Sequence, residues 1–244
     1  MNAVYVLLLF GAVVMLTHFL DGITGFGATV LALPFCTMLV GIRTAVPALT
    51  VFSWILSMFI VIIDRRHIVW HEFFKITGLV ILGLPAGMLL FSRLPERGLK
   101  IILGIFMVII AARGIYLSFR KTAKAIRVPG FLLNILLVIG GVVHGAFASG
   151  GPFVVIYATK NLPDKSNFRA TLCMLWVTLN TVMIIQKFMA GAMTPAVGQA
   201  VLVTLPFLAA GMILGNLAHG RLRADMFTKL IYIVLFVSGI FMFI

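Results

Sequence analysis

Residues 18–35, HFLDGITGFGATVLALPF, place an aspartate and three glycines inside an otherwise apolar run. Asp21 is the only acid well inside such a run, because the other five lie in loops or at segment ends. An acid at bilayer depth costs about 2.5–3.5 kcal/mol on insertion scales, so it usually has a partner or a task. His18 lies one helical turn earlier, and a carboxyl group beside an imidazole can carry a proton.

A second stretch, VVHGAFASGG at residues 142–151, repeats this pattern. Setting Asp21 on His144 aligns Gly22 with Gly145 and Gly27 with Gly150. We therefore predict a proton-coupling group of Asp21, His144 and His18. The alternative interpretation puts Asp21 near the membrane interface, where it caps a helix.

The glycines in both stretches predict a broken helix. Glycine permits the turn without side-chain strain, and Pro152 suits the first turn of a helix that restarts after a cap at Ser149 or Gly150. A restarting helix presents free N–H groups at its positive end, which favours an anion. The predicted substrate-binding residues are Thr24, Gly25, Gly27 and Thr29 in the first stretch, and Ser149, Gly150 and Gly151 in the second. The alternative is that these glycines only permit close helix packing.

Three further polar residues are candidates for the same anion site. Asn180 lies in an apolar segment and aligns with Trp54 of the first half. Arg43 and Arg169 begin equivalent segments, and each could attract or hold an anion. Topology and headgroup anchoring are the alternative roles for both arginines.

The elements that carry these residues are predicted to be membrane helices. Apolar residues make up 62% of the 244-residue chain and charged residues 10%, against about 45–50% and 25% in soluble domains. Long apolar runs include 2–17, 44–63, 76–91, 101–112 and 228–244, and a spanning helix needs about 20 such residues. The N-terminal run lacks the basic start of a signal peptide, so we read it as a first membrane helix.

The charge and the cysteines exclude several other classes. The net charge is +13, but the lysines and arginines mostly lie between apolar segments, where topology explains them better than nucleic-acid binding does. Cys36 and Cys173 both lie in apolar segments, so neither a disulfide framework nor a metal site is expected. No cofactor is expected either. The expected partners are a small anion, protons and the lipid bilayer, and a homodimer is compatible with the sequence.

The chain contains an internal duplication. LPAGMLL at 84–90 matches LAAGMIL at 208–214, and each is followed by Arg-Leu. The predicted units are a first transmembrane repeat (1–119), a basic linker (120–129) and a second repeat (130–244). The predicted apolar segments are 2–20, 23–42, 44–63, 73–91 and 99–119, then 130–147, 151–160, 169–189, 197–217 and 228–244. Such duplications are typical of secondary transporters, with the substrate site where the repeats meet.

The predicted fold is an all-α polytopic membrane protein with eight to ten membrane segments, two of them broken or re-entrant. If the short segments 23–42 and 151–160 cross the membrane, lysine and arginine divide fourteen against five between its sides; otherwise they divide nine against ten. The positive-inside rule prefers the first division. An odd number of crossings per half then makes the repeats inverted, with both termini outside. Against this, 152–159 is too short for a simple crossing.

These features resemble the sulfite exporter TauE/SafE family of membrane permeases. The most telling stretches are LPAGMLLFSRLPERGLKIILGIF and HGAFASGGPFVVIY, and the likeness covers nearly the whole chain. The first break reads GFGAT, where the family commonly has GxGGG. The resemblance implies secondary transport of small anions, often sulfite, sulfoacetate or other sulfonates, across a bacterial inner membrane.

The leading functional prediction is therefore an anion transporter with alternating access, driven by protons or by the membrane potential. Transport of a small carboxylate or an inorganic anion is the nearest alternative. An intramembrane enzyme is disfavoured, because the sequence has no HExxH or G-x-S-x-G motif and no obvious nucleophile–base pair. A non-transporting assembly partner is also disfavoured, because it would not need paired helix breaks.

Overall fold

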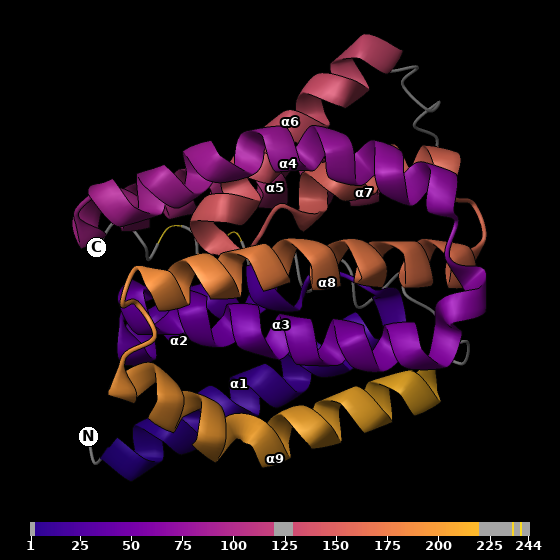
Figure 1. Ribbon diagram of the computed structural model, residues 1–244. Helices are drawn as coiled ribbons and strands as arrows, with labels where there is room; N and C mark the ends of the chain where they lie inside the picture. Colours follow the sequence, from indigo (N-terminus) through magenta and orange to yellow (C-terminus); the bar gives the residue numbers. More distant parts are fainter. Residues whose placement is uncertain (1–2, 120–128, 220–235, 237–239, 241–244) are drawn as a thin grey trace.

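The computed structural model describes residues 3–119 and 129–219, together with positions 236 and 240 (Figure 1). All regular structure in this part of the chain is helical. The helices are α1 (Ala3–Thr24), α2 (Ala28–Val40), α3 (Ile42–Asp64), the 3-10 turn η1 (Arg65–His67), α4 (Trp70–Arg93), α5 (Glu96–Phe119), α6 (Gly130–Phe147), α7 (Gly151–Asn161), α8 (Lys165–Met189) and α9 (Pro195–Ala218).

Seven of these helices are long and apolar enough to cross a membrane: α1, α3, α4, α5, α6, α8 and α9. The helices α2 and α7 are shorter, with 13 and 11 residues. The protein is thus a multi-pass membrane protein, and the part that the structure describes is all-helical. The predicted segment 228–244 and nearly all of the predicted linker 120–129 lie outside the described residues.

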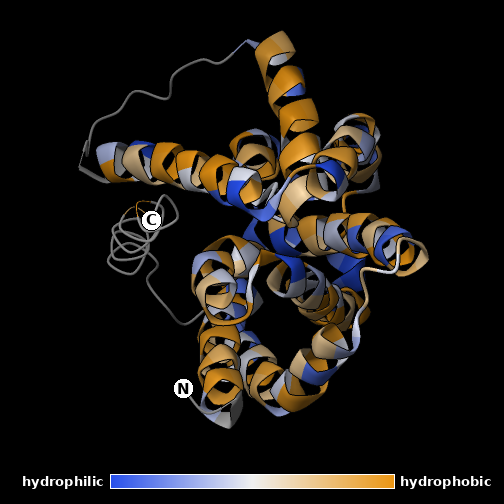
Figure 2. Ribbon diagram, turned by 90° about the vertical axis from the view of Figure 1, so that its left-hand side faces the viewer, coloured by the Kyte–Doolittle hydropathy of each residue, from blue (hydrophilic) through white to orange (hydrophobic). Residues whose placement is uncertain are grey.

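Many apolar side chains face outward, as they do in a protein surrounded by lipid. Many large hydrophobic residues are exposed along the long helices, for example Leu16, Ile62, Leu82, Ile109 and Leu202. Figure 2 shows these helices as mainly hydrophobic, with hydrophilic residues gathered where helices meet in the middle of the molecule. The polar residues singled out from the sequence are therefore mostly interior residues; Thr24 is half-buried and Arg43 is exposed.

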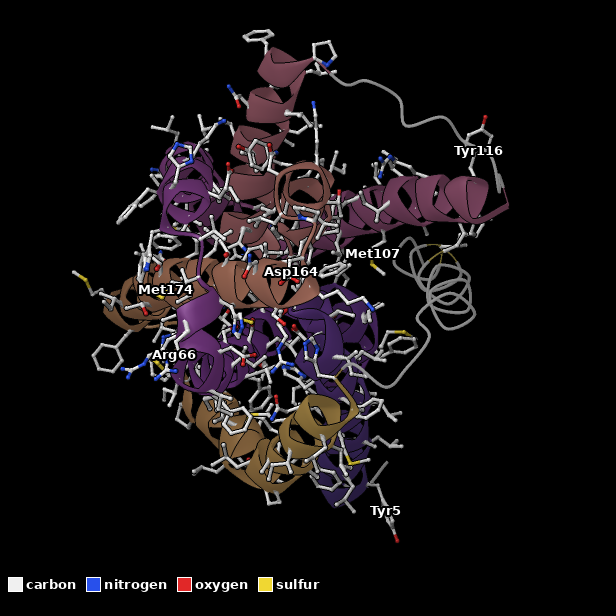
Figure 3. The ribbon with its side chains drawn as sticks, turned by 90° about the vertical axis from the view of Figure 1, so that its right-hand side faces the viewer. Tyr5, Arg66, Met107, Tyr116, Asp164 and Met174 are labelled. Carbon is white, nitrogen blue, oxygen red and sulfur yellow. The ribbon has the colours of Figure 1, made fainter. Side chains whose placement is uncertain are left out.

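Two helices at the centre, α3 and α8, lie side by side and run in opposite directions (Figure 1). Ser53 of α3 contacts Asn180 of α8, whereas Asp64 at the end of α3 contacts Arg169 near the start of α8. We call the end of the molecule where α3 begins the Arg43 end, and the opposite one the Arg169 end. Figure 3 looks onto the Arg169 end, where Arg66 and Asp164 are labelled.

Two further helix pairs flank this centre, and both are parallel. α1 packs against α9: a Cβ added to Gly211 of α9 would meet the Met15 carbonyl of α1, and one added to Gly215 would meet the Phe19 carbonyl. Because these contacts follow the same chain order in both helices, the two helices are parallel. α4 packs against α6 in the same manner. A Cβ added to Gly83 of α4 would meet the Val138 carbonyl of α6, and one added to Gly87 would meet the Val142 carbonyl, so these two helices are parallel as well. Helices α1, α3, α5 and α9 therefore start at the Arg43 end, and α4, α6 and α8 start at the Arg169 end.

Glycine makes this close approach possible in both flanking pairs. A Cβ added to Gly87 of α4 would overlap the Val142 carbonyl of α6, and one added to Gly145 of α6 would overlap the Leu84 carbonyl of α4. In the other pair, the Cβ of an alanine at Gly22 would lie 3.1 Å from the Gly215 Cα. Small residues let membrane helices pack backbone to backbone. The packing role that we considered for the glycines therefore holds for Gly22 and Gly145.

Candidate functional site

The first helix break lies between α1 and α2, as the glycine pattern predicted. Gly25 and Gly27 have φ angles of 80° and 104°, a region that residues with a side chain rarely adopt. The Thr24 hydroxyl lies 2.9 Å from the carbonyl oxygens of both Leu20 and Phe26. It therefore bonds to backbone on both sides of the turn.

Residues of helix α8 pack against this first break. The indole Nε1 of Trp176 donates to the Gly25 carbonyl oxygen at 3.0 Å. A Cβ on Gly25 would lie 2.9 Å from the Arg169 Cα, so no side chain fits between the break and α8. The break is thus packed against the second half of the chain rather than exposed to lipid, as broken membrane helices require.

The side chain of Asp21 caps α2 from within the protein. Its Oδ2 accepts a hydrogen bond from the Ala28 N–H at 3.2 Å, and the residue is only 5% exposed. The capping role that we considered is therefore present, but it occurs in the buried interior. Among the described residues Asp21 has no hydrogen bond to either His144 or His18.

The second break lies between α6 and α7. Ala148 has a φ of 53°, Gly150 is the N-cap of α7, and Pro152 lies in its first turn. Of the two predicted caps, Gly150 therefore takes the position. Ser149 instead donates its hydroxyl to the Phe147 carbonyl at 3.0 Å.

A small cavity lies between the two breaks. Its volume is about 20 Å³, which suffices for about one water molecule. Its lining comes from both halves: Asp21, Gly27, Thr29, Val30 and Ser53 from the first, and His144, Ala148, Ser149, Gly151 and Trp176 from the second. The first turns of α2 and α7 therefore meet at one point inside the protein.

A chain of hydrogen bonds joins the two halves beside this cavity. His144 Nε2 lies 3.1 Å from Asn180 Oδ1, and Asn180 Nδ2 donates to Ser53 Oγ at 3.2 Å. Because Asn180 presents its carbonyl oxygen to the imidazole, His144 Nε2 is the donor. The other ring nitrogen, Nδ1, is buried and has no partner among the described residues. The His144 ring also stacks on Trp176, with 5.2 Å between centroids.

Arg169 is the largest fully buried side chain of the described structure and is 1% exposed. Its Nη2 lies 3.4 Å from Asp64 Oδ2 and donates to Asn216 Oδ1. Its Nε and Nη1 are buried and have no partner among the described residues. Two nitrogens of a buried guanidinium are therefore available to donate to an acceptor at the Arg169 end.

The other predicted residues lie elsewhere. His18 is buried in α1, where its Nδ1 lies 2.9 Å from the Val14 carbonyl oxygen, and it does not line the cavity. Arg43 is exposed and donates to the carbonyl oxygens of Phe91 and Leu94 at the end of α4. Equivalent positions in the two halves thus hold one arginine on a helix end and one inside the protein.

Some residues of this region went unrecognised in the sequence. Asn216 accepts from Arg169, and His219 Nδ1 lies 2.8 Å from the Ile23 carbonyl oxygen beside the first break. Their only signal was two polar residues three positions apart at the end of an apolar run. Trp176 and Ser53 carried no signal, because tryptophan and serine are ordinary residues of membrane helices. Within the described residues, no three His, Cys, Asp or Glu side chains group as metal ligands.

Comparison with known proteins agrees with this architecture. The family model described as sulfite exporter TauE/SafE matches residues 9–242. The probable inner membrane transporter protein TsaS of Comamonas testosteroni is 25% identical over 180 residues, which cover 73% of this chain and 74% of that protein. No solved structure matches the chain. Because the family model covers nearly the whole chain, including both helix breaks, the chain belongs to the sulfite exporter TauE/SafE family and is a membrane transporter rather than an enzyme.

Proposed function

We propose that this protein is a secondary transporter of small anions, with sulfur oxyanions and organosulfonates as the first candidates. The observation that carries the proposal is the meeting of two helix N-termini, those of α2 and α7, at one buried cavity. Each N-terminus presents backbone N–H groups and the positive end of a helix dipole. Two such ends facing one space favour a negative charge there over a neutral molecule or a cation.

Protonation of Asp21 could be coupled to binding of the anion at this site. Its carboxylate lies on the same cavity and already accepts from the first N–H of α2. A substrate anion and a charged Asp21 would repel each other at this distance, with little water between them to weaken the repulsion. In our proposal, Asp21 is therefore protonated when the anion is bound. His144, whose Nδ1 has no partner among the described residues, also lines the cavity, and in our proposal it exchanges this proton.

The size of the cavity supports alternating access. A space of about 20 Å³ holds no sulfonate, so binding requires the two sides of the cavity to separate. The lining already divides between the first and the second half of the chain. In our proposal, the substrate enters when these sides part, and it leaves on the other face of the membrane after they have closed and reopened.

The helix directions support inverted repeats. The equivalent helices α3 and α8 are antiparallel, and they touch at Ser53–Asn180 and Trp54–Thr181, which are equivalent or adjacent positions of the two halves. The flanking pairs, α1 with α9 and α4 with α6, exchange when the halves are exchanged. Both relations are expected of a pseudo-two-fold axis in the membrane plane.

The charges support an orientation for this arrangement. Of the twelve lysines and arginines in the described part of the chain, five lie at the Arg43 end: Arg43, Arg93, Arg97, Lys100 and Lys187. By the positive-inside rule, we assign this end to the outside and the Arg169 end to the cytoplasm. Following the name of the Comamonas testosteroni relative, we place the protein in an inner membrane.

Anion-induced thermal stabilisation of the purified protein tests the proposal. The screen uses sulfite, sulfate, thiosulfate, taurine, sulfoacetate and small carboxylates, because a ligand that binds the folded state raises its stability by mass action. Thiosulfate is then titrated at an acidic and at a mildly alkaline pH, since its own charge does not change between them. We expect the wild type to bind more tightly at the acidic pH. In Asp21→Asn the two affinities should become equal.

Asp164→Asn is the matched control. Asp164 also caps a helix N-terminus, with its Oδ1 accepting from the Asn167 N–H at 2.9 Å, but it is exposed and far from the cavity along α8. It should keep the wild-type pH dependence. Stabilisation by carboxylates alone would replace the organosulfur assignment with a carboxylate one. If no anion stabilised the protein, the proposed anion site would be rejected.

A further inference from the structure

The Arg43 end of the α3–α8 pair holds an uncompensated positive charge. Lys187 lies in the last turn of α8 and is only 2% exposed. No acidic side chain or hydrogen-bond acceptor contacts its ammonium group within the part of the chain that the structure describes. Its Nζ lies 4.1 Å from the centre of the Phe91 ring. A buried ammonium without a counter-charge is costly, and a single cation–π contact recovers only part of that cost.

Arg43 adds a second cation at the same ring. Its guanidinium carbon lies 4.9 Å from the centre of the Phe91 ring. Two of its N–H groups are occupied by the carbonyl oxygens of Phe91 and Leu94, which fix the direction of the guanidinium. The side chains of Lys187 and Arg43 therefore converge on one aromatic ring from two different helices, α8 and α3.

The acids of the described structure do not neutralise this pair. Asp21 lies at the central cavity, and Asp64, Glu72 and Asp164 belong to the Arg169 end. Glu96 is the one described acid at the Arg43 end, and its Oε1 is 3.1 Å from Lys100 Nζ. The other charged side chains described at this end, Arg93 and Arg97, are cations as well, and Tyr5 of α1 is neutral in its protonated form.

At the opposite end of the same two helices, the chain itself supplies partners for a buried cation. There the buried Arg169 meets Asp64 from α3 and Asn216 from α9. At the Arg43 end the chain supplies a second cation where the Arg169 end supplies a carboxylate. This difference points to a negative charge that comes from outside the chain.

We propose that Lys187 and Arg43 form a second oxyanion site, separate from the central cavity, at the Arg43 end of the α3–α8 pair. Lys187 supplies an ammonium point charge, and the guanidinium of Arg43 supplies the N–H groups that Phe91 and Leu94 leave free. If the proposed transport function holds, this site captures the substrate at the outer face before it reaches the cavity. Binding of an oxyanion here does not itself depend on transport.

Sulfate titrations in a neutral detergent test this site. Four proteins are compared by thermal unfolding: wild type, Lys187→Met, Lys187→Arg and the matched control Lys100→Met. Methionine keeps the length of the side chain and removes its charge. Replacing a buried uncompensated ion by an apolar side chain of similar volume is tolerated or stabilising, so Lys187→Met should melt at or above the wild-type temperature without sulfate.

We expect the half-saturating sulfate concentration to rise about tenfold or more in Lys187→Met. Lys187→Arg and Lys100→Met should retain the wild-type value. Sulfate also stabilises proteins without binding, but that effect is common to all four proteins and cancels in the comparison. An unchanged response in Lys187→Met would overturn the site, as would a loss of stability of Lys187→Met in the absence of sulfate.

Two further arms separate the sources of the anion and the two proposals. A lipid phosphate offers the same oxyanion, so the titration is repeated with a short-chain phosphatidylglycerol. A Lys187-dependent response to sulfate assigns the site to free anions, a response to the lipid alone assigns it to a headgroup, and a response to neither removes it. Asp21→Asn reports on the central cavity. A Lys187 effect without an Asp21 effect would keep this site and reject the proposed function, and the converse result would do the opposite.

Discussion

A single hydrogen bond from the indole of Trp176, in the second half of the chain, reaches the Gly25 carbonyl in the first half. The Gly25 carbonyl is buried in the turn between α1 and α2, where Trp176 Nε1 donates to it and the Cys173 thiol approaches to 4.0 Å. Without the indole, this carbonyl would keep only the weak S–H donor of Cys173 at 4.0 Å. A buried acceptor without a good partner costs about 1–3 kcal/mol. We therefore expect Trp176→Phe to lower the free energy of unfolding by about that amount. Reversible unfolding in mixed detergent micelles measures it.

Trp54→Phe is the control at the same scale. Trp54 Nε1 donates to Thr181 Oγ1 at 2.8 Å, but that hydroxyl also bonds the Val177 carbonyl at 2.7 Å and keeps a partner when the indole is removed. Its loss should cost under about 1 kcal/mol. Equal losses in the two variants would show that the Gly25 bond has no special weight.

At the scale of helices, the parallel pairs depend on glycines that touch the neighbouring backbone. An alanine at Gly87 would overlap the Val142 carbonyl, so α4 and α6 must move apart to admit it. Overpacking of this kind costs about 1–3 kcal/mol. We expect Gly87→Ala to lower the melting temperature and Gly211→Ala, at the equivalent position of α9, to do the same.

Each of these helices carries its own control glycine. Gly78 of α4 and Gly198 of α9 have nothing within 4 Å of an added Cβ. Alanine favours a helix over glycine by about 0.5–1 kcal/mol, so Gly78→Ala and Gly198→Ala should be neutral or stabilising. If all four variants behaved alike, helix propensity rather than close packing would explain the effect.

At the scale of the whole molecule, the proposed orientation predicts which residues face each side of the membrane. Arg97 and Lys165 are both exposed, at the Arg43 end and the Arg169 end respectively. The natural cysteines Cys36 and Cys173 are buried and should react little. We expect a membrane-impermeant maleimide to label Arg97→Cys in intact cells and Lys165→Cys only in inverted vesicles.

The reverse labelling pattern would place the Arg43 end in the cytoplasm and reject the positive-inside assignment. Labelling of both cysteines from one side would reject the membrane arrangement of α3 to α8 itself, because these two positions lie at opposite ends of the spanning helices. The wild-type protein, which carries neither substitution, measures the background labelling of Cys36 and Cys173.

The sequence by itself determined the class of the molecule and the places where its helices break. Long apolar runs are sufficient for this, because a backbone in lipid must satisfy its hydrogen bonds within each helix. The breaks followed from local chemistry as well. Gly25 and Gly27 adopt positive φ angles, and Pro152 lies in the first turn of α7, as their residue types required.

Only the tertiary structure decided which polar groups meet. The sequence grouped Asp21 with His144 and His18 for proton coupling and left a helix cap as the alternative; in the structure its carboxylate accepts the Ala28 N–H, and His144 bonds to Asn180. Arg43 and Arg169 occupy equivalent positions, but one lies on the end of α4 and the other beside Asp64. The physical reason is the same in each case. These contacts depend on how separate helices are placed against one another, across one turn for Asp21 and between distant segments for the others, and a pattern of leucine, alanine and glycine does not specify which faces will touch.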